Sequence, residues 1–102
     1  MQRIGELIPE AARHLGLEEE LRLSRAIATF GAIVAERVPA ASGACRLVRV
    51  DGFALLVEAD APIVAQELRL RAPELLDALA SSPGGPRATE LRIRVRREGR
   101  AV

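Results

Sequence analysis

The last apolar stretch of the chain, LRIRVR from residue 91, alternates aliphatic and basic side chains. This period of two predicts a strand whose aliphatic side chains lie on a buried face. The intervening positions are all arginine, so their side chains project together from the opposite face: Arg92, Arg94 and Arg96. A guanidinium group binds phosphate oxygens through paired hydrogen bonds. The chemistry that this segment could support is therefore binding of a phosphate-bearing partner.

Further arginines extend this basic set. Arg97 and Arg100 follow the strand, and Arg46 or Arg49 could join it if their strand were a neighbour. An ordinary solvated face, with Glu90 and Glu98 as partners, explains the same pattern equally well. Aromatic residues that could stack on bases are absent from this basic set. Binding is therefore expected to be electrostatic and salt dependent. The candidate nucleic-acid contacts are Arg46, Arg49, Arg92, Arg94, Arg96 and Arg97.

Residues for catalysis or metal binding are sparse. The only histidine, His14, would have to serve as base for any of four serines, Ser24, Ser42, Ser81 and Ser82. No group of residues has the spacing of metal ligands, and Cys45 lies among apolar strand residues as a core thiol. The Pro83–Pro86 turn lacks the lysine and the following helix of a phosphate-binding loop. We expect neither an enzyme nor a cofactor.

A β-hairpin precedes the basic strand in the chain. Asp51-Gly52 provides the turn between predicted strands over 45–50 and 53–59. In the second strand a period of two predicts a buried face made of Phe53, Leu55, Val57 and Ala59.

Helices account for the rest of the chain. Apolar spacing predicts one helix over 4–15, ended by Gly16, and a second over 18–38, ended by Pro39. A third begins after Asp60, which is expected to cap it, and Pro73 splits or bends it. The predicted fold class is α+β, in the order α-α-β-β-α-β, with a three-stranded sheet covered on one face by helices.

Length and composition are those of a single domain over 1–102. The chain is 49% hydrophobic and 28% charged, with a formal net charge of +1. Its apolar runs are too short to span a bilayer, and the first residues do not resemble a signal peptide. We therefore expect a cytoplasmic protein without a membrane partner or a small-molecule substrate.

The chain also resembles the DciA family, which is associated with the DnaB-type replicative helicase of bacteria. The FGAIVA segment matches a family helix element, with phenylalanine in place of tryptophan, and a glycine-led strand follows it. The next helix begins VAQEL, where the family has tryptophan before AQEL. The positions that carry the resemblance are Phe30, Ile33, Val34, Gly52, Leu55, Val57, Val64, Ala65, Gln66, Glu67 and Leu68.

The resemblance implies a KH-like fold and a non-enzymatic role in DNA replication. The implied partners are the replicative helicase and single-stranded or forked DNA. Two alternatives stay open: a protein-interaction module without a nucleic-acid role, and a KH-like RNA-binding module. The Gly-x-x-Gly loop with which KH domains clamp a nucleic-acid backbone is missing from the sequence.

Overall fold

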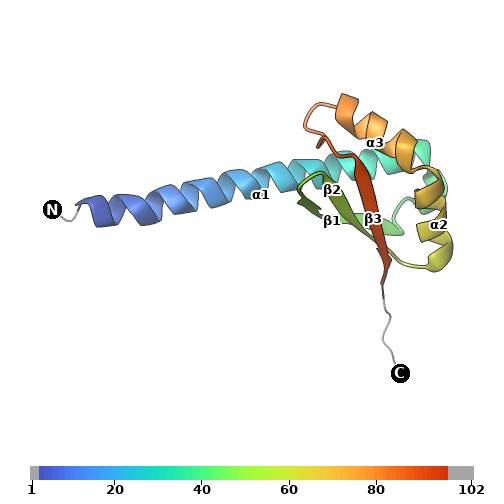
Figure 1. Cartoon of the computed structure of the whole chain (residues 1–102), viewed down its shortest axis with the longest axis horizontal. Helices are drawn as coiled ribbons and strands as arrows, with labels where there is room; N and C mark the ends of the chain where they lie inside the picture. The colour runs from blue at the N-terminus through green and yellow to red at the C-terminus, as the bar shows by residue number, and fades with distance from the viewer. Residues whose placement is uncertain (1–2, 97–102) are drawn as a thin grey trace, which may run out of the picture.

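The computed structural model describes the backbone of residues 3–96 and the side chains of residues 16–96. The fold is α+β and KH-like, as predicted, with three α-helices and a three-stranded mixed sheet. In chain order the elements are α1 (Arg3–Arg37), the 3-10 turn η1 (Pro39–Ala41), β1 (Cys45–Asp51), β2 (Ala54–Ala59), α2 (Pro62–Leu70), α3 (Ala72–Ser81) and β3 (Glu90–Val95) (Figure 1).

The sheet has the strand order β1-β2-β3. β1 and β2 form the predicted antiparallel hairpin, and β3 pairs with β2 in parallel. A parallel partner requires a long crossover, which α2 and α3 provide. The arginine-bearing strand β3 is therefore an edge strand, and β2 separates it from β1.

One boundary predicted within the first helix is wrong. We predicted two helices divided at Gly16, whereas α1 runs unbroken from Arg3 to Arg37. An exposed glycine costs a helix only about 1 kcal/mol, and the residues that follow Gly16 are mostly good helix formers. The first half of α1 projects away from the sheet (Figure 1), and residues 16–22 are all exposed.

The core lies between the helices and one face of the sheet. Its largest fully buried side chains come from all three helices and from β2: Phe30, Val34, Leu55, Val57, Leu68, Leu75 and Leu79. Aliphatic side chains dominate this core, and the burial of each contributes about 1.5–3 kcal/mol before the entropy of ordering is subtracted.

The predicted burial of Phe53 is also wrong. Leu55, Val57 and Ala59 are buried as expected, but Phe53 is 72% exposed. The turn occupies Gly52 and Phe53, and Gly52 adopts a φ of 63°, so the strand begins only at Ala54. Phe53 therefore lies at the hairpin tip.

The third predicted helix is split, as the position of Pro73 suggested. α2 ends at Leu70, and α3 starts two residues later with Pro73 in its first turn. The predicted helix cap at Asp60 is wrong, because Ala61 is the N-cap residue of α2 and makes no side-chain cap hydrogen bond. The Asp60 carboxylate is instead bonded to arginine, as described below.

Candidate nucleic-acid interface

The arginines predicted from the alternation in β3 lie on the sheet face opposite the core. Arg92 and Arg94 belong to β3 and Arg96 follows it, and more than half of each side chain is exposed. β1 contributes Arg46, which is in register with Glu58 of β2, and Glu58 is in register with Arg94. One row across the sheet thus reads arginine, glutamate, arginine.

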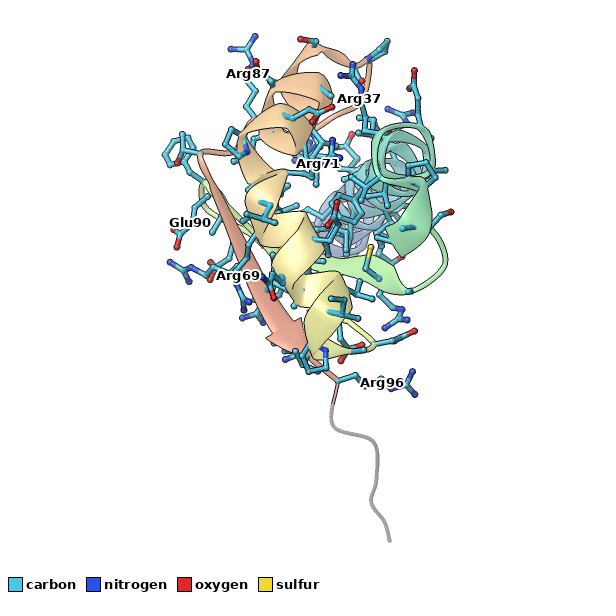
Figure 2. The ribbon with its side chains drawn as sticks, turned by 90° about the vertical axis from the view of Figure 1, so that its right-hand side faces the viewer. Arg37, Arg69, Arg71, Arg87, Glu90 and Arg96 are labelled. Atoms are coloured by element: carbon cyan, nitrogen blue, oxygen red, sulfur yellow. The ribbon has the colours of Figure 1, made fainter. Side chains whose placement is uncertain are left out.

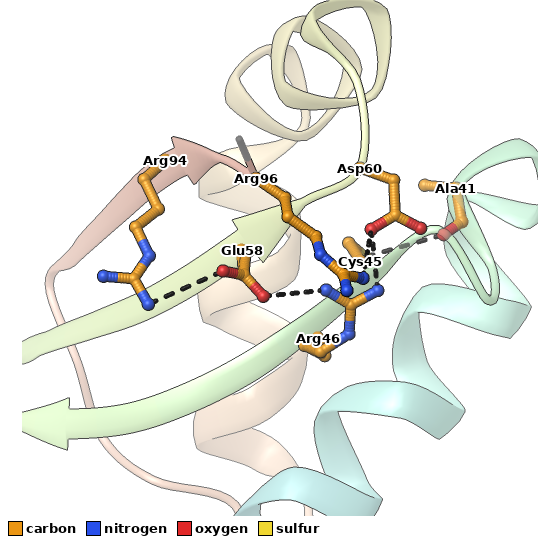
Figure 3. Close-up of polar contacts among 7 residues, drawn as sticks. All are labelled: Ala41, Cys45, Arg46, Glu58, Asp60, Arg94 and Arg96. Carbon is orange, nitrogen blue, oxygen red and sulfur yellow. Dashed lines mark hydrogen bonds and ion pairs between the residues drawn. The ribbon is translucent and has the colours of Figure 1, made fainter. Parts of the chain in front are cut away.

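These side chains form a connected network that we call the arginine–carboxylate ladder, consisting of Arg94, Glu58, Arg46, Asp60 and Arg96 (Figure 3). Arg46 donates from Nη1 to Glu58 Oε1 at 2.9 Å and from Nη2 to Asp60 Oδ1 at 2.8 Å. Arg94 Nη2 lies 3.6 Å from Glu58 Oε2, and Arg96 Nη1 lies 4.0 Å from Asp60 Oδ1.

The ladder is close to electrically balanced, with three guanidinium groups and two carboxylates. The hydrogen bond to Asp60 is the main cause of a raised pKa of Arg46; desolvation opposes it, and the hydrogen bond to Glu58 adds to it. Exposed ion pairs of this kind contribute only about 0–1 kcal/mol each, so a phosphate group can compete for the guanidinium groups.

Arg92 and Arg49 lie outside the ladder on the same face. Arg92 donates to Glu90 of its own strand at 3.1 Å, and this bond raises the pKa of Arg92. Leu56 of β2 lies between them, in register with Arg49 of β1 on one side and with Arg92 of β3 on the other. Arg49 has no ion pair among residues 16–96. Arg97 and Arg100 lie outside the described residues.

Arg92, Arg94 and Arg96 share one face, as the alternation predicted, but the carboxylates between the arginines were not predicted. Glu58 and Asp60 continue the outward-facing positions of β2, so the alternation already contained the signal. The prediction of a continuous basic stripe would have needed β1 and β3 to be neighbours, whereas β2 lies between them.

Other arginines carry no partner in the part of the chain with described side chains. They are Arg22 and Arg25 on α1, Arg49 on β1 and Arg87 in the loop before β3, and all are exposed. Figure 2 shows Arg87 and Arg96 at opposite ends of the molecule. Arg37 and Arg71, by contrast, are paired with Glu74 on the helical side.

The positions that carry the family resemblance are mostly structural. Seven of them are buried: Phe30, Ile33, Val34, Leu55, Val57, Ala65 and Leu68. Gly52 supplies the left-handed turn conformation, and Val64 packs against the core. Gln66 is exposed, while Glu67 is half-buried and pairs with Arg71 at 3.4 Å. These residues therefore position the sheet and leave its open face to other residues.

Two of the serines considered in the sequence, and Cys45, donate to backbone carbonyl oxygens. Among the residues with described side chains, no cluster of three or more histidine, cysteine, aspartate or glutamate residues could hold a metal ion. Ser81 and Ser82 each donate to a carbonyl oxygen one turn earlier in α3. Burial raises the pKa of the Cys45 thiol, which donates to the Ala41 carbonyl at 3.5 Å. Within the described range, no helix is long and apolar enough to cross a membrane.

The comparisons with known proteins concern the family of the chain. No curated protein matches the chain. The family model described as "Dna[CI] antecedent, DciA" matches residues 3–93, which is most of the chain and includes all three helices and nearly all of the sheet. The chain therefore belongs to the DciA family, whose general role in DNA replication is that of a helicase loader or accessory.

Proposed function

We propose that this domain is a non-enzymatic replication accessory that binds the DnaB-type replicative helicase and single-stranded or forked DNA. The family match over residues 3–93 is the observation that carries the proposal. A replication accessory acts on the chromosome, and this supports a cytoplasmic location in a bacterium.

The open sheet face supports the DNA part of the proposal. Arg92, Arg94 and Arg96 line the edge strand and its end, with side chains that are 55–57% exposed. Their ion pairs are at the surface and are easily exchanged for phosphate contacts. Arg49 adds an unpaired guanidinium group on the same face, and Arg46 extends it across the sheet; Arg97 follows Arg96 in sequence.

The DNA contact is tested by the salt dependence of binding to a labelled single strand. With about four phosphates neutralised, log affinity should fall with log salt at a slope near −3. Replacement of Arg92, Arg94 and Arg96 by alanine should make that slope shallower by about 2. An unchanged slope in the triple variant would exclude this face as the DNA contact.

The helicase contact is tested separately, by light scattering on mixtures of the domain with the replicative helicase of its own organism. A complex at both low and physiological salt is the expected result. A complex that forms only at low salt would indicate a contact made mainly by surface charge. No complex at either salt concentration would contradict the helicase part of the proposal while leaving the DNA part to its own test.

One observation favours the alternative of a protein-interaction module. Leu17 and Leu21, one turn apart on the projecting part of α1, are 52% and 59% exposed. Exposed leucines at this spacing are typical of a helix that packs against another protein. In that case the domain should bind a protein partner with a salt-independent affinity, and Leu17→Ala with Leu21→Ala should abolish the complex.

A further inference from the structure

The hairpin tip presents an exposed aromatic ring. Phe53 is 72% exposed, whereas the only other phenylalanine, Phe30, is 1% exposed at the centre of the core. The backbone of Phe53 is nevertheless held firmly, since its carbonyl oxygen accepts hydrogen bonds from Thr89 N at 2.9 Å and from Glu90 N at 3.2 Å. The tip therefore offers a flat apolar surface on a fixed support.

One loop joins the hairpin tip to two arginines that make no ion pair with a described residue. The loop before β3 contacts α1 at Gly84, where an added Cβ would lie 3.8 Å from Cβ and Cδ of Arg25. The same loop reaches the hairpin tip at Thr89. Arg87 lies between these two points, so the loop connects Arg25 to Phe53 through Arg87. Arg25 and Arg87 are exposed and make no ion pair with any described residue.

The length of this edge is limited by the loop. Residues 84–89 span at most about 18 Å when fully extended, at roughly 3.5 Å per residue. The phosphates of one strand rise by about 3.4 Å each in a fully stacked helix and lie farther apart in an extended strand, so the edge accommodates about five nucleotides at most. One aromatic ring and two guanidinium groups along such a length are the parts that single-strand binding surfaces combine.

The nearby carboxylates do not neutralise this edge. Glu90, next to Thr89, is held by Arg92 at 3.1 Å on the open sheet face. Asp51 precedes the turn and acts on Arg92, where it contributes to the raised pKa of that guanidinium. The positive charges of Arg25 and Arg87 therefore remain available to an anionic partner.

We propose that the edge formed by Phe53, Arg87 and Arg25 binds single-stranded nucleic acid, with a base stacked on the Phe53 ring and phosphates on the two guanidinium groups. This inference rests on the nucleic-acid part of the proposed function and assigns a single-strand contact to the hairpin edge. A base inside a duplex is already stacked on both sides, so only an unpaired base can cover the ring.

The test compares variants by fluorescence anisotropy with a labelled ten-nucleotide single strand and with a blunt duplex of the same sequence. Phe53→Ala should weaken binding to the single strand about 5- to 150-fold, the range expected for loss of one base–aromatic stack. Its salt slope should stay unchanged, and its affinity for the duplex should change less than twofold. Arg87→Ala and Arg25→Ala should each make the slope shallower by about 0.7.

Matched controls separate these effects from general loss of charge or apolar surface. Ile63→Ala removes another side chain that is 73% exposed, and Arg71→Ala removes an arginine already paired with Glu67 and Glu74. Neither control should alter single-strand binding more than twofold. A single strand containing 2-aminopurine should change its emission on binding the unaltered domain and not on binding Phe53→Ala.

Three results would overturn the inference in different ways. If the unaltered domain binds no nucleic acid even at low salt, the nucleic-acid part of the proposed function fails. If it binds and Phe53→Ala binds equally well, only the hairpin-edge inference fails. If Phe53→Ala no longer binds the helicase but still binds the single strand, the ring contacts protein and not nucleic acid.

Discussion

The Glu58 carboxylate accepts a hydrogen bond from Arg46, at 2.9 Å, from the directly opposite position of the neighbouring strand. On its other side the same carboxylate lies 3.6 Å from the guanidinium group of Arg94. One glutamate therefore neutralises arginines from both edge strands of the sheet. This makes Glu58 the residue that sets how much positive charge the open face presents.

Glu58→Gln should strengthen DNA binding. The change removes the charge that competes with phosphate for Arg46 and Arg94, so affinity at low salt should rise about 2- to 5-fold, as expected for loss of one surface ion pair. The slope of log affinity against log salt should become steeper by about 0.7 if one more phosphate is bound. Anisotropy titrations of a labelled single strand at several salt concentrations measure both quantities.

Glu74→Gln is the matched control for this prediction. It makes the same change in net charge, but Glu74 pairs with Arg37 and Arg71 on the helical side. If both variants strengthened binding equally, the effect would come from overall charge and the open sheet face would not be the DNA contact.

Two glycines should respond in opposite ways to replacement by alanine. A Cβ at Gly85 would overlap the carbonyl oxygen of Leu79, so the loop that leads to Arg87 would have to shift. Gly85→Ala should therefore lower the free energy of unfolding by about 1–3 kcal/mol, the usual cost of overpacking. The melting temperature should fall by roughly 5–20 °C in a domain of this size.

Gly31 lies in the exposed interior of α1, and a Cβ there would have no atom within 4 Å. Gly31→Ala should raise the free energy of unfolding by about 0.5–1 kcal/mol, because alanine favours the helix and has less freedom to lose on folding. Thermal melts followed by circular dichroism measure the stability of Gly85→Ala and of Gly31→Ala relative to the unaltered domain. A destabilised Gly31→Ala would show that this side of α1 packs against something, such as a second copy of the chain.

Local signals in the sequence predicted most of the fold. The hairpin at Gly52, the strand positions and the split at Pro73 each depend on residues close in the chain, and each is confirmed. The turn itself occupies Gly52 and Phe53 instead of Asp51 and Gly52, and of the aliphatic side chains in β3 Leu91 and Ile93 are half-buried while Val95 is 39% exposed. The helix boundary predicted at Gly16 is wrong because a single glycine only weakens a helix. The free-energy cost of this glycine is smaller than the cost of interrupting a long run of helix-forming residues.

The site was harder to predict because it depends on strand order. That Arg46 and Arg94 share a glutamate follows from β2 lying between their strands, and an interaction between residues 46 and 94 has no local signal. Asp60 was assigned to a helix cap by its position before Pro62, but two arginines compete for its carboxylate. Phe53 is exposed because the turn includes it, although Leu55, Val57 and Ala59 alternate with the predicted phase.

Cys45 should react slowly with thiol reagents. Burial raises the pKa of its thiol, an effect that Arg46 partly opposes, so the reactive thiolate is scarcer in the folded domain than in the unfolded chain. At pH 8 iodoacetamide should modify the folded domain several times more slowly than the same chain in urea, and the folded rate should keep rising beyond pH 8.5, about where a free thiol reaches half ionisation. Mass spectrometry of timed samples follows both reactions.

The same pKa shift has a consequence for stability. Since the folded thiol holds its proton more tightly than the unfolded one, its contribution is fully present below about pH 8.5 and is lost as pH rises through the folded pKa. The difference in unfolding free energy between the unaltered domain and Cys45→Ala should thus be constant near neutral pH and should shrink above pH 8.5. Rapid alkylation at pH 7, or a difference that grew with pH, would mean that Cys45 is an activated thiol, and a chemical role for this residue would then have to be reconsidered.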